Sequence, residues 1–253
     1  MQDKKKRYIN IFLLIAIILL IQAIPFNLFI KNIYIIGLLK IVLSIVAIIY
    51  YFYYIKKESL EGPRLRGVRL KDLLFLPFLL IPFSNLIVAT IGGFDLVEPN
   101  INYLLLSIAR VFSIAVVEEL LFRSLLLNEF RRDKDKLSAL IYSSLIFGAT
   151  HLLNISSIAS ILPALIQAIY TAGLGLLLGL IYIKSNNIAY PIIFHFLFNY
   201  FNDTLVSNIF IFEWNYLFYI INTIVAIVFI LYGIFIYYIY KEDEYNASEA
   251  LDI

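Results

Sequence analysis

Two glutamates and an arginine interrupt an otherwise apolar stretch, VVEELLFRS, at residues 116–124. Glu119 and Arg123 are four residues apart, which makes them neighbours on one face of a helix, so we interpret them as a structural ion pair. Glu118 points roughly 100° away from Glu119, because an α-helix has about 3.6 residues per turn. Arg110, two turns earlier, is a candidate to compensate Glu118. A buried carboxylate without a close partner suits general acid or base chemistry, so Glu118 is the candidate catalytic residue.

The only two histidines of the chain also lie in apolar stretches. His151 ends the sequence FGATH, and His195 lies within YPIIFHFLFN. At about 1.5 Å of rise per residue, Glu118, His151 and His195 lie about 14, 21 and 10 Å from the predicted cytoplasmic ends of their helices. Asn199 follows His195 by four residues and shares its face, with Asn202 close by. We therefore predict a polar cavity inside a helical bundle.

The elements that position these residues are predicted to be membrane-spanning helices. Of the 253 residues, 62% are hydrophobic, and the mean hydropathy is +0.90. A transmembrane helix needs about 20 mostly apolar residues. The fold class is thus an all-α polytopic membrane protein, a single integral domain over 1–253, with the first run an uncleaved helix. The chain contains eight such runs, at 8–29, 32–55, 70–93, 101–127, 137–154, 159–183, 188–208 and 214–240.

Lysine and arginine set the predicted orientation in a cell membrane. They concentrate before the first run, in the connection 56–71, in RRDKDK after the fourth run and at Lys184, whereas the opposite connections contain almost none. Both termini are therefore predicted to be cytoplasmic, with 241–253 as a short polar tail. The absence of cysteine excludes disulfides and thiolate catalysis. No basic face with interleaved aromatic residues suggests nucleic acid as a partner.

Three other features have structural interpretations. The sequence AGLGLLLG at 172–179 is interpreted as small residues that let two helices approach closely, rather than as a phosphate-binding loop. Lys40 is expected to snorkel or to be paired within the bundle. Asp203 continues the face of His195 by another turn, either as a supporting partner or near the outer interface.

Three short motifs in this order resemble those of the CAAX-protease and bacteriocin-processing family of intramembrane proteases, also known as the Abi or CPBP family. EELLFR supplies Glu118, Glu119 and Arg123, FGATH supplies Phe147 and His151, and HFLFN supplies His195 and Asn199. The family motifs read EExxxR, FxxxH and HxxxN. The resemblance covers a motif-bearing core of about 70–208.

This resemblance implies an eight-helix membrane endopeptidase. Glu118 would act with His151 to activate a water molecule, and His195 with Asn199 would stabilise the tetrahedral oxyanion. The expected partners are the lipid bilayer and a peptide or membrane-protein substrate, cleaved near the cytoplasmic face. Processing of a lipidated C-terminus is the alternative enzymatic function. A different class, an ion-coupled transporter or a non-catalytic immunity or scaffold protein, is also kept as a hypothesis.

A metal site is a separate question. Glu118, His151 and His195 could ligate zinc with a water in the fourth position. They come from three predicted helices, however, and lack the HExxH spacing that places two ligands on one helical face. We therefore expect a mechanism that requires no cofactor, and keep zinc as an alternative.

Overall fold

The fold is a bundle of helices. A computed structural model describes residues 2–92, 94–155, 160–211 and 216–239, which contain no strand apart from one isolated bridge between Leu96 and Phe210. In chain order the elements are α1 (Gln2–Gln22), η1 (Phe26–Leu28), α2 (Ile33–Lys57), η2 (Leu70–Phe83), α3 (Ser84–Ile91), α4 (Ile101–Glu119), η3 (Leu120–Leu127), α5 (Asn128–Asp133), α6 (Lys136–Thr150), η4 (His151–Asn154), α7 (Ile161–Ser185), α8 (Ala189–Asn199), η6 (Tyr200–Thr204), α9 (Leu205–Ile209) and α10 (Tyr216–Ile239).

The all-helical architecture predicted from the sequence is confirmed for the described residues. Six described helices are long and apolar enough to cross a membrane, namely Lys4–Leu28, Ile33–Lys57, Leu70–Ile91, Lys136–Asn154, Ile161–Ser185 and Ile220–Tyr238. The two other predicted spans, 101–127 and 188–208, are helical but are not among these six. A total of eight spans therefore stays a prediction. The predicted tail 241–253 lies outside the described residues.

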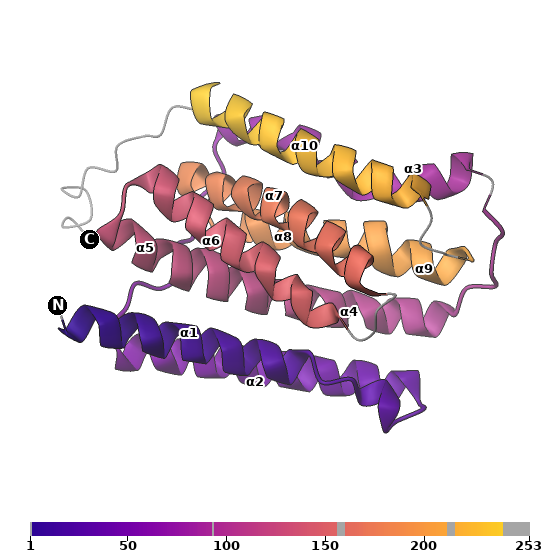
Figure 1. Ribbon diagram of the computed structural model, residues 1–253, viewed down its shortest axis with the longest axis horizontal. Coiled ribbons are helices and arrows are strands. Elements are labelled where there is room, and N and C mark those ends of the chain that lie inside the picture. The colour runs from indigo at the N-terminus through magenta and orange to yellow at the C-terminus, as the bar shows by residue number, and fades with distance from the viewer. Residues whose placement is uncertain (1, 93, 156–159, 212–215, 240–253) are drawn as a thin grey trace.

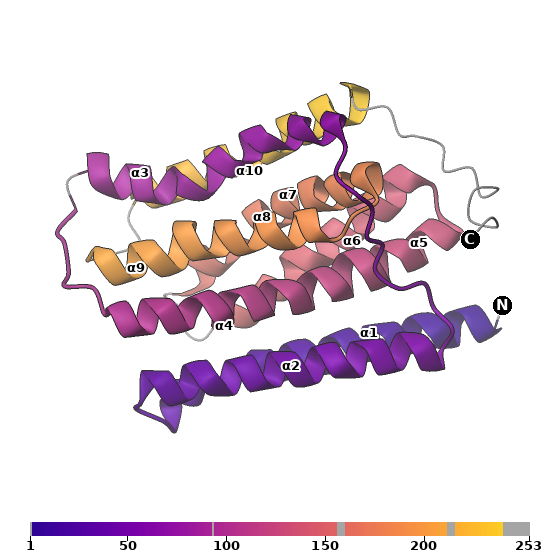
Figure 2. The same ribbon diagram turned by 180° about the vertical axis from the view of Figure 1, so that it is seen from behind.

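The helices run roughly along one common axis (Figures 1 and 2). α1 and α2 form a pair that packs on α4 at one side of the bundle, whereas α3 and α10 lie together at the opposite side. α6, α7 and α8 occupy the interior between these pairs. The bundle centre therefore receives one helix from each predicted motif: α4, the end of α6, and α8.

Large apolar side chains cover the outside of the peripheral helices. This arrangement suits a protein whose surrounding solvent is lipid, because exposed apolar surface of this extent is unfavourable in water. Representative exposed side chains are Leu13, Ile17 and Leu20 on α1, Val42, Ile45 and Ile49 on α2, and Ile227, Leu231 and Ile234 on α10.

Polar side chains define where several helices begin. Asn32 accepts from the backbone N–H of Tyr34 at 2.9 Å and starts α2, and Asn100 accepts from Tyr103 at 3.0 Å and starts α4. Asp135 starts α6 in the same way. Each side chain satisfies one of the backbone donors that a helix leaves free in its first turn.

The basic segments meet at one end of the bundle. Lys4 Nζ lies 2.9 Å from an oxygen of Asp133, which joins the start of α1 to the end of α5. Arg69 Nη2 donates to the carbonyl of Lys184 at 2.8 Å, which joins the connection before η2 to the end of α7. A hydrogen bond from Tyr8 and the contact with Lys4 hold the pKa of the exposed Asp133 carboxyl below its usual range. The clustering agrees with the predicted orientation, whose direction in the membrane stays a prediction.

Lys40 is paired within the bundle. Its ammonium donates to the carbonyls of Gln22 and Ile24, where α1 ends, and lies 5.2 Å from the ring centre of Phe26. Carbonyls in the last turn of a helix have no partner within that helix, so the charge both satisfies them and complements the helix dipole. This contact fastens the turn between α1 and α2.

The glycines of α7 permit close helix packing, as predicted. A Cβ on Gly175 would lie 3.1 Å from the ring of Phe147 on α6, and a Cβ on Gly173 would lie 3.2 Å from the carbonyl of Ala226 on α10. α7 is thus in close contact with both neighbours, and it holds the helix of the FxxxH motif in place.

The tightest approach of a described glycine to a backbone atom occurs at Gly148 of α6, and we expect its replacement by alanine to destabilise the protein. The new Cβ would lie 2.5 Å from the carbonyl oxygen of Ala168 and 2.7 Å from Cβ of Ala172. Such overpacking costs about 1–3 kcal/mol of unfolding free energy. Thermal unfolding in detergent micelles measures the change. Gly233→Ala is the matched control, because its Cβ would meet nothing within 4 Å; equal stability of the two variants would contradict the packing argument.

Candidate active site

His195 of α8 lies between the two glutamates at the end of α4. Its Nδ1 is 2.7 Å from Oε1 of Glu119, and its Nε2 is 3.4 Å from Oε2 of Glu118. His195 and Glu119 are buried, whereas the Glu118 side chain keeps 18% of its surface exposed. A doubly protonated imidazole can donate toward both carboxylates, and the longer contact leaves Nε2 less firmly held than Nδ1.

Arg123 completes this cluster from the helical turn after Glu119. Its Nε lies 3.0 Å from Oε2 of Glu119, and the guanidinium carbon lies 4.3 Å from the ring centre of Phe147. Only 2% of the Arg123 side chain is exposed. Glu119 and Arg123 have opposite charges at ion-pair distance. This mutual compensation makes their burial tolerable, because an isolated charge in such a site costs several kcal/mol.

His151 faces the same region from the first residue of η4, directly after α6. The centre of its ring lies 5.3 Å from the ring centre of Phe147, and the two rings are nearly perpendicular. The ring centre of His195 lies 5.6 Å from that of Phe147, also nearly perpendicular to it. Both imidazoles therefore contact one phenylalanine, and Glu118 is within electrostatic range of His151. The Nδ1 atom of His151 lies 3.2 Å from the carbonyl of Phe147. If Nδ1 donates its proton there, Nε2 retains a lone pair and can act as a base.

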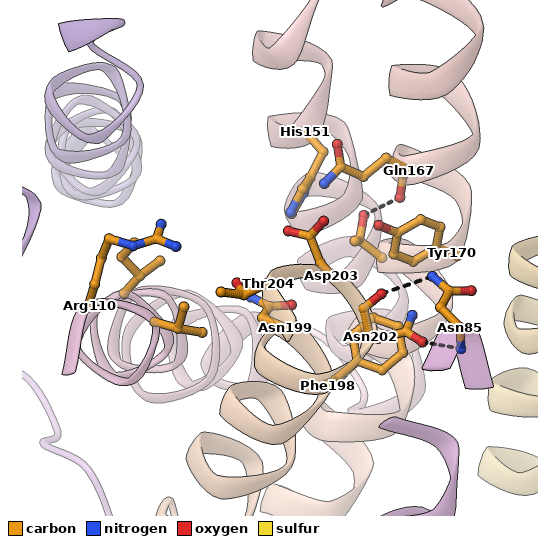
Figure 3. Close-up of a pocket in the computed structure, with 13 residues that line it drawn as sticks. Asn85, Arg110, His151, Gln167, Tyr170, Phe198, Asn199, Asn202, Asp203 and Thr204 are labelled. Atoms are coloured by element: carbon orange, nitrogen blue, oxygen red, sulfur yellow. Dashed lines mark hydrogen bonds between the residues drawn. The ribbon is translucent and has the colours of Figure 1, made fainter. Parts of the chain in front are cut away.

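A cavity of about 330 Å³ adjoins this cluster (Figure 3). His151 and Asn199 line the cavity. Ile114, which lies one helical turn before Glu118 on α4, lines it as well. α4 runs toward the basic end of the bundle and α8 runs away from it, so the cavity lies on the side of the glutamates remote from that end. The complete lining is Asn85, Arg110, Val111, Ile114, His151, Gln167, Tyr170, Thr171, Phe198, Asn199, Asn202, Asp203 and Thr204.

Two of the three motif-bearing helices, α4 and α8, change to π-helical geometry next to their motif residues. η3 (Leu120–Leu127) follows Glu119 directly, and η6 (Tyr200–Thr204) follows Asn199 directly. A π-helical turn inserts extra residues and re-aims the side chains beyond it, and such turns are frequent at functional sites. Asn199, Asn202 and Asp203, on the last residue of α8 and within η6, all line one cavity.

Asn202 anchors the η6 turn to α3. Its side-chain oxygen accepts from the hydroxyl of Ser84 and from the backbone N–H of Asn85, both at 2.8 Å. Asn85 in turn donates from its side chain to the carbonyl of Asn202 at 3.0 Å, as the dashed lines in Figure 3 show. This pair of buried asparagines holds the segment that follows Asn199 against the first turn of α3.

The structure brings most of the predicted site residues together, with two differences. Glu118, expected to lack a close partner, faces His195, which a single-helix argument could not show because the partner comes from α8. Arg110 lines the cavity and forms no ion pair with Glu118 among the described residues. Asn85 and Gln167 also line the cavity and were not predicted, although they lie in apolar runs as the two histidines do.

The described residues do not assemble a metal site. Among them, no group of three histidine, aspartate or glutamate side chains converges closely enough to hold an ion, and this includes the zinc set of Glu118, His151 and His195. The Nδ1 atom of His195 is also engaged by Glu119. We therefore derive no chemical step through a metal.

A comparison with protein families identifies one match. Residues 100–201, which include all three motifs, match the model described as type II CAAX prenyl endopeptidase Rce1-like. Neither the curated proteins nor the solved structures contain a significant match to the chain.

Proposed function

From the premise that residues 100–201 place this chain in the CAAX protease family, we propose that it is an intramembrane endopeptidase. The observation that supports this most directly is a polar cavity inside an apolar bundle, lined by His151 and Asn199. It lies beside the contact between Glu118 and His195. Polar groups at such depth are costly, and they usually mark a functional site.

In the proposed mechanism, Glu118 and Nε2 of His151 hold a water molecule and remove its proton as its oxygen attacks the peptide carbonyl. Carboxylates and imidazoles are the usual general bases, and each suitably placed base contributes about 10²–10⁴-fold in rate. The same proton then passes to the leaving amine nitrogen, so that cleavage yields a carboxylate and an amine. The partial exposure of Glu118 beside the cavity supports access by water.

His195 and Asn199 are proposed to stabilise the oxyanion. Nε2 of His195 has only a 3.4 Å contact with Glu118, so its N–H is available to a stronger acceptor. The described structure records no hydrogen bond for the Asn199 side chain, which lines the cavity. Removing one such donor from a water-poor site costs about 10²–10³-fold in rate. Glu119 and Arg123 would act by holding His195 through its Nδ1.

The substrate class is proposed to be a peptide or a membrane protein, and the family description adds lipidated C-terminal peptides as a second candidate. The sequence predicted cleavage near the cytoplasmic face, and that location remains part of the proposal. The cavity lies on the side of the glutamates remote from the basic end, and it would hold the part of the substrate that extends toward the opposite half of the bundle.

Purified protein in lipid nanodiscs tests the proposal. A defined peptide mixture, half of it farnesylated at a C-terminal cysteine, is incubated with the protein and analysed by mass spectrometry. We expect new peptide termini that depend on His151 and are lost in His151→Ala. Retention of activity after chelation would support the metal-independent mechanism. Ion flux into vesicles without any cleavage would contradict the protease proposal and favour a transporter.

A further inference from the structure

Arg110 is a cation of the cavity wall without an anionic partner. It lies on α4, two turns before Glu118, and its Nε is buried without a hydrogen-bond partner. The described structure records no ion pair for its guanidinium. Arg110 as a whole is half-buried, but a guanidinium N–H that is buried without a hydrogen-bond partner is costly, so its presence in a cavity wall indicates a bound anion.

The neighbours of Arg110 give the cavity an electrostatic polarity. Lys40 on α2 is within electrostatic range, but its ammonium is occupied by the carbonyls that end α1. Asp203 is the anionic residue that lines the cavity, and it lies across from Arg110 beside His151 (Figure 3). The two charges are in electrostatic range and yet form no ion pair. A ligand between them would therefore be oriented with its negative group toward α4.

We propose that Arg110 is a specificity-determining residue that binds a carboxylate of the peptide substrate. The inference rests on the proposed peptidase function and adds which chemical group of the substrate the cavity recognises. A guanidinium matches a carboxylate in bidentate geometry, and it remains charged at every physiological pH. The carboxylate is that of an aspartate or glutamate side chain or of the free C-terminus of the substrate.

The helix geometry sets the distance from this carboxylate to the cleaved bond. Arg110 and Glu118 are separated by about 12 Å, from eight residues at about 1.5 Å each. An extended peptide advances about 3.3 Å per residue. The bound carboxylate is therefore three to four residues from the bond that Glu118 acts on.

The test uses the full-length protein in nanodiscs and a peptide that it cleaves. Four versions are compared: the peptide ends in a free acid or an amide, and it carries aspartate or asparagine three or four residues from the cleaved bond. The variants are Arg110→Gln, Arg110→Lys and, as matched control, Arg64→Gln, which removes a positive charge at the basic end. Thermal unfolding verifies that each variant is folded, and Arg110→Lys keeps the charge if Arg110→Gln is unstable.

We expect the wild-type protein to prefer one carboxylate version by about 10- to 100-fold in kcat/KM, mainly through KM, as for a hydrogen bond to a charged group. Arg110→Gln should lose this preference, Arg110→Lys should retain part of it, and Arg64→Gln should retain all of it. If the preference in kcat/KM is for the free acid over the amide, the bound carboxylate is the C-terminus of the peptide. If it is for aspartate over asparagine, the bound carboxylate is that side chain. An unchanged preference in Arg110→Gln would overturn the inference and leave the peptidase function intact.

A binding measurement separates the two proposals. The same four peptides, labelled with a fluorophore, are titrated against Glu118→Gln and against Glu118→Gln combined with Arg110→Gln. If the wild-type protein cleaves nothing, the peptidase function fails. Tighter binding of a carboxylate version that depends on Arg110 would then still support the anion site, whereas equal binding of all four versions would overturn it.

Discussion

Replacing Glu118 with glutamine is expected to reduce peptide cleavage by about 10²–10⁴-fold, the contribution of a well-placed general base. Glutamine has nearly the same size and can still contact His195, so the fold should be retained. It has no negative charge, however, and cannot take a proton from water. The expected loss is therefore in kcat, with a small change in KM, and the initial rate of peptide release at saturating substrate measures it.

Glu98→Gln is the matched control for this variant. Glu98 is an exposed residue of the connection before α4, so its neutralisation changes the total charge equally and leaves the cavity unaltered. Cleavage by Glu118→Gln within a few-fold of the wild-type rate would assign the base to another residue. His151 would then be the remaining candidate, since it shares the site and retains a free ring nitrogen.

Sequence reasoning identified the components of the site, because each of them violates the apolar pattern of its helix. Glu118, His151 and His195 stand out for this reason, and the i, i+4 spacing of Glu119 and Arg123 gave their pairing directly. The helices and most of their boundaries were also predictable, since a bilayer requires long apolar runs between polar connections. These are all properties of one helix at a time.

The arrangement between helices was not predictable in the same way. The contact of His195 with both glutamates depends on how α8 packs on α4, and no spacing within either helix encodes it. The π-helical turns after Glu119 and Asn199 shift the face of the residues beyond them, so a uniform 3.6-residue period misplaces those residues. Arg110 was expected near Glu118 and is found in the cavity wall instead, because eight residues of the regular helix α4 separate the two by about 12 Å along the axis.

The Glu119–Arg123 pair should have the largest effect on stability. We expect Arg123→Met to lower the free energy of unfolding by about 3–5 kcal/mol, because removal of one partner leaves a buried charge uncompensated. Glu119 would then retain only His195, in a site where neither side chain has appreciable exposed surface. Unfolding of the protein in mixed micelles by increasing amounts of a denaturing detergent measures the difference.

The double variant Glu119→Gln, Arg123→Met separates charge from packing. It removes both charges, and the glutamine can still accept a hydrogen bond from Nδ1 of His195. We therefore expect it to be more stable than Arg123→Met alone, although it has one further substitution. Arg132→Met supplies the control, because Arg132 forms an ion pair with Glu129 at the same 3.0 Å distance but is 53% exposed. Its loss should cost only about 0–1 kcal/mol. A double variant that is less stable than Arg123→Met would contradict this explanation. Arg123 would then contribute through its packing on Phe147 and not through neutralisation of the Glu119 carboxylate.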